Sequence, residues 1–185
     1  MLKIIVATAA ILLPTAAMAE DWGKFYAEVY GGATLGNDTE YDGLDYAMDP
    51  TWAAGAAFGV DMGNGFSLGI DIMKTGDAQY QGEDATLSTF SVMAEGEYAL
   101  ALNDTMSVYG SLGLGAINVA IDGDSSDNAW GAGYQAAVGV RANVTENMAL
   151  FGEFKHQSTF DDVELFGVDV SAPTNTALVG VRLSF

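Results

Sequence analysis

The chain has 185 residues with 23 glycines and no cysteine, and 25 acidic against 6 basic residues give it a net charge of −19. This length suits one domain, and a hydrophobic fraction of 50% is too high for a disordered chain despite the charge. The lack of cysteine excludes disulfides and cysteine-based sites, the single histidine leaves little for a histidine metal centre, and the few lysines and arginines argue against nucleic-acid binding.

Residues 1–19 have the features of a secretory signal peptide. Lys3 provides a positive start, and residues 4–13 form an apolar segment that is too short to cross a bilayer as a helix. Residues 17–19 then give the small-x-small pattern of a cleavage site. The sequence therefore predicts export, with a signal peptide over 1–19 and one mature domain over 20–185.

After this segment, apolar and small residues recur at every second position. From Phe25 to Leu35 the odd positions are all apolar or small, whereas the even positions include Glu28 and Thr34. A period of two is typical of a β-strand, and most segments have the roughly ten residues that a tilted strand needs to cross a membrane. The eight predicted strands are 25–35, 52–62, 66–72, 90–100, 106–114, 130–140, 148–154 and 177–185.

The connections between these strands alternate between short and long. The predicted turns cover 63–65, 103–105 and 145–147, and the predicted loops cover 36–50, 75–86, 118–129 and 157–173. Short turns at one end and long loops at the other are typical of outer-membrane barrels. The sequence therefore predicts an all-β fold, an eight-stranded antiparallel up-and-down transmembrane β-barrel.

Soluble and membrane barrels share this alternation but differ in which face points inward. A soluble barrel has its apolar face inside, whereas a membrane barrel turns that face to lipid and encloses its polar face. Here the polar face carries many small residues, such as Gly55, Gly69 and Gly139, which suit a narrow interior. Aromatic residues lie near the ends of the apolar face, as Phe90 and Tyr98 do on one strand. Their separation of roughly 26 Å along the strand matches the apolar band of a membrane barrel once tilt is included. We therefore expect the apolar face to contact lipid.

The last strand and the hairpin before it resemble those of a known family. Gly180, Leu183 and the terminal Phe185 resemble the C-terminal recognition signal of bacterial outer-membrane proteins. Residues 151–156, followed by the acidic segment 161–164, resemble the last hairpin of opacity-type small outer-membrane barrels. The resemblance covers the whole mature chain in architecture, with its specific motifs near the C-terminus.

This resemblance implies a location in the bacterial outer membrane, with the loops outside the cell. The implied partners are outer-membrane lipid and lipopolysaccharide, the barrel-assembly machinery and periplasmic chaperones, and a monomer is expected. The assembly machinery would read Gly180, Leu183 and Phe185. The family does not imply one activity, because its members serve as adhesins, as structural barrels or in unknown roles.

Charged residues occupy the polar face of several predicted strands. Arg141, Lys155 and Arg182 lie on strands that come close to the first strand and Glu28 when the barrel closes. Because charges in a dry lumen must pair, the sequence predicts an ion-pair network that fills the interior. A gated, narrow cation-selective pore is the alternative. The predicted network consists of Glu28, Glu95, Glu97, Arg141, Glu153, Lys155 and Arg182, and Asp61 and Asp71 share its face.

One pair of residues resembles a catalytic site. His156 and Ser158 have the spacing of the His-x-Ser pair of outer-membrane lipid A deacylases, and Glu164 or Asp169 could serve as the acid of a triad. His156, however, falls on the apolar face. We therefore predict no catalytic residues, and a histidine at the lipid–water boundary is the ordinary explanation.

The four predicted loops are strongly acidic. They contain well over half of the acidic residues and no lysine or arginine. Residues 122–128 place oxygen atoms as a calcium loop does, but Asp127 stands where that loop needs glycine. Such a composition usually indicates loops that are solvated and repel one another. The alternatives are that the loops capture divalent cations or dock a basic partner. No cofactor or metal site is predicted.

The expected function is that of a non-enzymatic outer-membrane barrel with a structural role in envelope integrity. A loop-mediated adhesin or binding protein is the first alternative. A narrow cation-selective porin and a lipid A deacylase are the others.

Overall fold

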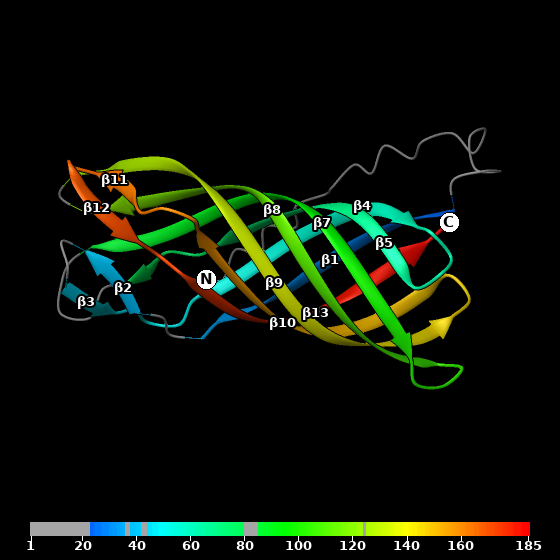
Figure 1. Ribbon diagram of the computed structural model, residues 1–185. Coiled ribbons are helices and arrows are strands. Elements are labelled where there is room, and N and C mark those ends of the chain that lie inside the picture. The colour runs from blue at the N-terminus through cyan, green and yellow to red at the C-terminus, as the bar shows by residue number, and fades with distance from the viewer. Residues whose placement is uncertain (1–22, 36–37, 42–43, 80–84, 124) are drawn as a thin grey trace.

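Eight long strands of the computed structural model form a closed antiparallel barrel (Figure 1). Each long strand pairs with the next one along the chain, and β13 closes the barrel against β1. The predicted eight-stranded up-and-down barrel is confirmed. The structure describes residues 23–35, 38–41, 44–79, 85–123 and 125–185. The barrel strands are β1 (Lys24–Thr34), β4 (Trp52–Asp61), β5 (Phe66–Thr75), β7 (Thr86–Ala101), β8 (Met106–Asp122), β9 (Asp127–Thr145), β10 (Met148–Thr159) and β13 (Thr174–Ser184).

The two faces of the barrel have the polarity predicted for a membrane protein. Val138 and Val179 on the outer face are 60% and 69% exposed, and Leu68 is 50% exposed. On the inner face Lys155 and Gln135 are only 2% and 1% exposed. Because apolar side chains cover the outside and charged ones lie inside, this barrel is built to contact acyl chains rather than water. Among the described residues, no helix is long and apolar enough to cross a membrane.

Three tight turns join strands at the end of the barrel that also holds the C-terminus, called here the turn end (Figure 1). In the first turn Gly63 and Gly65 have positive φ angles of 77° and 85°, which glycine adopts without strain. The Asp61 carboxylate accepts a hydrogen bond of 2.8 Å from the Gly63 N–H, and Asn103 accepts one of 2.9 Å from the Thr105 N–H in the second turn. Short polar side chains that satisfy backbone donors thus fix these turns.

The opposite end, called the loop end, contains more strand than the sequence predicts. The predicted loop over 118–129 is wrong, because β8 and β9 stay paired as far as Ile121 and Asp127. Only residues 123–126 lie between the two strands. β7, β8 and β9 therefore extend further toward the loop end than the ten-residue strands β4 and β5.

The extension of β8 reverses the polarity of its two faces. Nearer the turn end, Leu112 and Leu114 point outward and are 72% and 62% exposed. Beyond Gly115 the apolar residues point inward instead, and Ile117 and Val119 are 3% and 1% exposed. This reversal fits a strand that leaves the membrane, since its outer side then meets water and its inner side packs on the mouth of the barrel.

The first and last long connections form a second sheet with the order β11-β12-β2-β3. Its central pairing joins Val170 to Tyr41 and thus joins the last long connection to the first. Figure 1 shows this sheet at the loop end, away from the C-terminus. The strands are β2 (Asp38–Tyr41), β3 (Leu44–Ala47), β11 (Val163–Leu165) and β12 (Val168–Ser171), and the short β6 (Ala78–Gln79) pairs with β7.

Candidate functional site

Two arginines and two glutamates form an ion-pair cluster across the lumen. Arg141 holds both carboxylate oxygens of Glu97, at 2.9 Å and 2.7 Å. Arg182 reaches Glu97 at 3.0 Å and Glu28 at 3.1 Å, and Arg141 also lies 3.5 Å from Glu28. In the closed order of strands β7 and β13 are on opposite walls, so the contact between Arg182 and Glu97 crosses the barrel. The cluster is electrically balanced and connects four strands.

Aromatic rings cover the faces of both guanidinium groups. Arg182 stacks on the Tyr26 ring at 3.6 Å, and Arg141 stacks on the Tyr109 ring at 4.5 Å. Arg182 also donates a hydrogen bond of 3.1 Å to the hydroxyl of Ser67. Since guanidinium groups bind carboxylates in their plane and aromatic rings on their face, both arginines are held in two directions.

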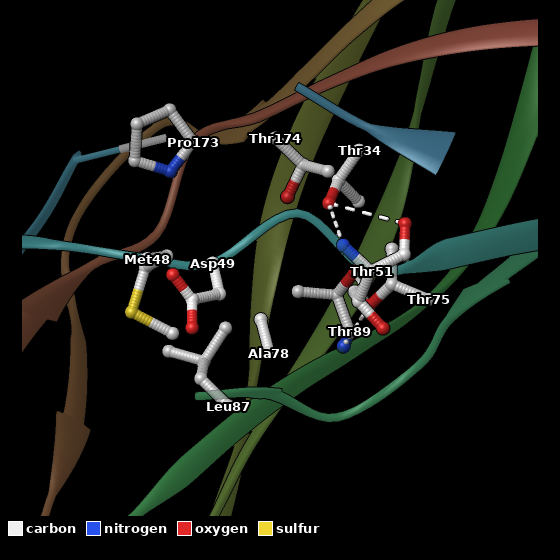
Figure 2. Close-up of a pocket in the computed structure, with 10 residues that line it drawn as sticks. All are labelled: Thr34, Met48, Asp49, Thr51, Thr75, Ala78, Leu87, Thr89, Pro173 and Thr174. Carbon is white, nitrogen blue, oxygen red and sulfur yellow. Dashed lines mark hydrogen bonds between the residues drawn. The ribbon is translucent and has the colours of Figure 1, made fainter. Parts of the chain in front are cut away.

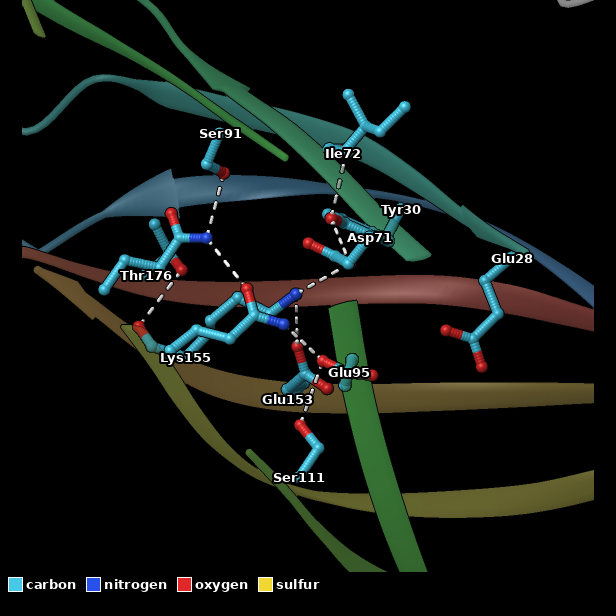
Figure 3. A network of polar contacts seen from close by, with 12 residues as sticks. Glu28, Tyr30, Asp71, Ile72, Ser91, Glu95, Ser111, Glu153, Lys155 and Thr176 are labelled. Atoms are coloured by element: carbon cyan, nitrogen blue, oxygen red, sulfur yellow. Dashed lines mark hydrogen bonds and ion pairs between the residues drawn. The ribbon is translucent and has the colours of Figure 1, made fainter. Parts of the chain in front are cut away.

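Lys155 is the centre of a second group (Figure 3). Its ammonium lies 3.0 Å from Asp71 and 3.4 Å from Glu153. Tyr30 donates a hydrogen bond of 2.7 Å to Asp71, and Tyr109 donates one of 3.1 Å to Glu153. Lys155 and Asp71 are each 2% exposed, so this pair depends on its neighbours for the contacts that water would otherwise supply.

Glu95 belongs to a layer of amides and hydroxyls rather than to an ion pair within the described residues. Its carboxylate accepts hydrogen bonds from Gln135 and, at 3.1 Å, from Ser111. Gln157 continues the layer by donating bonds of 2.9 Å to Gln135 and to Ser91. Polar side chains thus cross the lumen at several heights.

Large rings fill the space beside glycines of the inner face. A Cβ atom added at Gly59 would come within 2.6 Å of Cζ of Tyr26, and one at Gly180 would come within 2.5 Å of Cζ of Phe151. No Cβ atom fits at such distances, so these positions require glycine. The many small residues on the polar face therefore make room for rings, as the sequence suggested for a narrow interior.

Toward the loop end lies a threonine-lined cavity of about 20 Å³, which has room for one water (Figure 2). Thr34 accepts a hydrogen bond of 2.8 Å from the Thr51 N–H, and Thr75 accepts one of 2.8 Å from the Thr89 N–H. An apolar cluster covers the mouth beyond this layer. It comprises Met48, Ala78, Leu87, Met93, Ile117, Val119, Ile121, Val163, Leu165, Val170 and Ala172.

All seven charged residues predicted for the lumen point inward, in three settings. Four of them form the cross-barrel cluster, Glu153 and Lys155 belong to the second group, and Glu95 lies in the amide layer. The predicted network omits Asp71, the strongest partner of Lys155, and Gln135. The period of two could have identified both residues, because Asp71 and Gln135 each lie on the polar face of their strand.

The three residues predicted to form the assembly signal lie on or next to β13. Leu183 and Phe185 point outward and are 43% and 44% exposed, whereas Gly180 lies beneath the ring of Phe151. Phe185 exchanges two backbone hydrogen bonds with Phe25, of 2.9 Å and 3.1 Å. The three residues therefore lie at the seam where β13 meets β1 and the barrel closes.

The residues that resemble the His-x-Ser pair of a lipid A deacylase do not form a catalytic arrangement. The His156 ring bonds at 2.8 Å to the side chain of Asn175, and the Ser158 hydroxyl donates to the carbonyl of the next residue. Within the described residues no hydrogen bond joins His156 to Ser158. Glu164 and Asp169 lie opposite each other in the β11–β12 hairpin with both side chains exposed. A serine nucleophile needs its base within hydrogen-bond distance, and this geometry does not provide it.

Asp127, in the segment that only partly resembles a calcium loop, binds backbone N–H groups instead. Asp127 accepts backbone hydrogen bonds of 2.9 Å from Asn128 and 2.8 Å from Phe166. The second bond connects β9 to the tip of the β11–β12 hairpin. Across the part of the chain that the structure describes, no group of three or more histidine, aspartate or glutamate residues is arranged to hold a metal ion.

Comparison with known proteins identifies the architecture. A family model described as the outer membrane protein beta-barrel domain matches residues 5–185. The structure of Neisserial surface protein A is similar with a TM-score of 0.69 and 16% identity, covering 87% of this chain and 97% of that one. Ail, the attachment invasion locus protein of Yersinia pestis, has a TM-score of 0.56 and 16% identity, covering 89% of this chain and 99% of that one.

The same fold also carries an enzyme. The outer-membrane protease OmpT from Escherichia coli has a TM-score of 0.54 and 9% identity, covering 88% of this chain and 97% of that one. No curated protein sequence matches this chain. Identities this low establish a shared fold, and they leave the activity to be argued from the residues themselves.

Proposed function

This chain belongs to the outer membrane protein β-barrel domain family and lies in the bacterial outer membrane, and from that premise we propose a non-enzymatic, structural role in envelope integrity. The filled lumen is the observation that supports this role. Ion pairs join opposite walls, rings occupy the space between them, and an apolar cluster covers the mouth. Such an interior makes a rigid barrel that adds protein mass to the membrane without offering a wide path through it.

Deletion of the gene tests this role. We expect the deletion strain to become more sensitive to detergents and to large antibiotics that the intact outer membrane excludes. Expression of the wild-type chain should restore resistance. Unchanged sensitivity of the deletion strain, with the protein abundant in the wild type, would contradict the structural role.

A loop-mediated adhesin is the second candidate, supported by the sheet of β2, β3, β11 and β12 at the loop end. Its β11–β12 hairpin exposes Glu164, Asp169 and, at the tip, Phe166. Phe166 is 46% exposed and has a positive φ of 53°, and Asp127 holds its N–H. The similar structure Ail is named for attachment and invasion, which agrees with a role of this kind.

One triple variant separates the two candidates. Glu164→Ser, Phe166→Gly and Asp169→Ser change only exposed side chains, and glycine suits the positive φ. If the barrel is structural, this variant should restore detergent resistance as well as the wild type does. Loss of surface attachment together with intact resistance would favour the adhesin.

The remaining expectations follow from the resemblance. We propose that the barrel-assembly machinery recognises Gly180, Leu183 and Phe185, that periplasmic chaperones are further partners, and that the barrel is a monomer. Replacement of Phe185 by alanine should lower the amount of folded protein in the outer membrane. A lipid A deacylase is not proposed, because His156 and Ser158 have separate partners.

A further inference from the structure

The outer face of the barrel is hollowed across β13, β1, β4 and β5. The groove has a volume of about 440 Å³ and its outward side chains are apolar. Ala27 and Ala56 form a low floor because each contributes only a methyl group. The walls are formed by Val29, Val181 and Leu183 on one side and by Phe58, Ile70 and Ile72 on the other.

A lysine lies at the loop end of this groove. Ile72 is paired with Ala56, and two residues further along β5, on the same face, Lys74 is paired with Ala54. Lys74 is exposed, and the neighbouring Trp52 is 54% exposed on the same outer face. An ammonium group with an indole beside it is typical of the level at which a bilayer changes from acyl chains to head groups.

Lys74 differs from every other described lysine and arginine. Arg141, Lys155 and Arg182 are buried in the lumen, and Lys24 lies at the turn end. Lys74 is thus the one exposed cation at the loop end of the described chain, where it forms no ion pair. A cation that the acidic protein leaves unpaired at this level attracts an anion from the membrane.

We propose that the groove and Lys74 together bind one molecule of lipid A, with an acyl chain in the groove and a phosphate on the ammonium. From Lys74 to Ile70 is about 14 Å along the strand, or about 10 Å across the membrane after tilt, which is nearly one leaflet of the apolar band. The loop end faces outward, so the leaflet is the outer one, where the phosphorylated lipid is lipid A. This site rests on the outer-membrane location and does not depend on the structural role proposed above.

Native mass spectrometry of the refolded full-length barrel with hexa-acylated lipid A tests the site. Lys74→Ala removes the cation and should weaken retention about fivefold, the effect of one lysine near an anionic surface. Ala56→Phe fills the floor of the groove and should weaken retention at least as much. The same substitution Lys74→Ala should have no effect on binding of lipid A that lacks both phosphates.

Two variants serve as matched controls. Lys24→Ala makes the same charge change at the turn end, and Ala132→Phe adds the same ring to an exposed position of β9, a strand that does not line the groove. Both should retain lipid A like the wild type, and a heat-modifiable gel shift verifies that all four variants are folded. Equal retention by Lys74→Ala or by Ala56→Phe would overturn the site. Equal retention of phosphatidylglycerol with the same dependence on Lys74 would also overturn it, as a general phospholipid contact.

Discussion

At the scale of single residues, the guanidinium of Arg182 contacts side chains from three other strands, whereas a contact between two paired strands joins only those two. It contacts Glu28 on β1, Ser67 on β5 and Glu97 on β7, while Tyr26 covers its face. Its side chain is 4% exposed. Removal of one member of a buried ion-pair cluster costs more than the cluster contributes, because the remaining charges stay buried without a partner.

We therefore predict that Arg182→Met destabilises the barrel by about 3–5 kcal/mol, since it leaves Glu28 and Glu97 with one arginine between them. Urea unfolding of the refolded protein in detergent measures this. Lys24→Met, which removes an exposed cation at the turn end, is the control and should change the free energy of unfolding by less than about 0.5 kcal/mol. A loss below about 1 kcal/mol for Arg182→Met would contradict a tightly coupled cluster.

A second prediction concerns the glycines beneath the rings. Gly59→Ala places a methyl group against Tyr26 and the carbonyl of Leu68, and we expect it to destabilise the barrel by about 1–3 kcal/mol. At Gly110 an added Cβ meets its nearest neighbour, the carbonyl of Ala137, at an ordinary 3.6 Å. Gly110→Ala should therefore be nearly neutral in the same unfolding measurement, and equal effects of the two substitutions would contradict the ring packing.

Sequence reasoning at this scale identifies the inward face but not the partners on it. The period of two places Glu97 and Arg182 in the lumen, yet their contact depends on how far each strand is shifted along its neighbours. The sequence does not give that shift between β1 and β13, because no turn joins these two strands. In the structure Glu28 and Arg182 are direct cross-strand partners at this seam. Which charges meet could therefore not be predicted.

At the scale of whole elements, the reversal of polarity along β8 explains the mistaken loop over 118–129. The apolar positions change from even to odd near Gly115, and a search for one continuous alternation ends there. The reversal itself is a sequence signal for the point at which a strand leaves the membrane. In the same way, β2 and β12 are only four residues long, which is too short for a period of two to identify them, and Val170 of β12 belongs to the apolar cluster.

The reversal predicts opposite outcomes at two adjacent residues. Val119 is buried in the apolar cluster. Val119→Asp should therefore lower the free energy of local unfolding at the loop end by at least about 2 kcal/mol. Ala120 points outward above the membrane, so Ala120→Asp should be tolerated. Cleavage of the folded barrel by chymotrypsin at Phe160 and Phe166 should be at least about tenfold faster only in Val119→Asp, since tenfold corresponds to about 1.4 kcal/mol. Similar cleavage of both variants would contradict the assignment of the two faces.

At the scale of the molecule, the interior is a series of layers. From the turn end the lumen holds the arginine cluster, the lysine group, the amide layer, the threonine cavity and the apolar cover. The overall fold, the strand number and the inside-out polarity were all predictable, because each follows from periodicity and composition. The cover was not, because it assembles residues from three separate connections with residues of β7 and β8.

We expect this layered interior to block steady ion flow. Recording from single molecules in planar bilayers should show no stable openings of nanosiemens size, because the threonine cavity has room for one water and the cover lies above it. A triple variant with serine at Ile117, Val119 and Leu165 should also show no stable openings, because the ion-pair layers still fill the lumen. Stable nanosiemens openings of the wild type would favour the porin alternative.

The position of Arg182 on the last strand has a consequence for biogenesis. Until β13 docks, Glu28 and Glu97 have only one of their two cationic partners, and the two walls of the cylinder have no charge contact with that strand. A barrel without β13 would therefore leave Glu28 and Glu97 with Arg141 alone in a lumen of low dielectric constant. We expect such a barrel not to close stably in the membrane, because the missing strand carries the second cation as well as the backbone partners of β1.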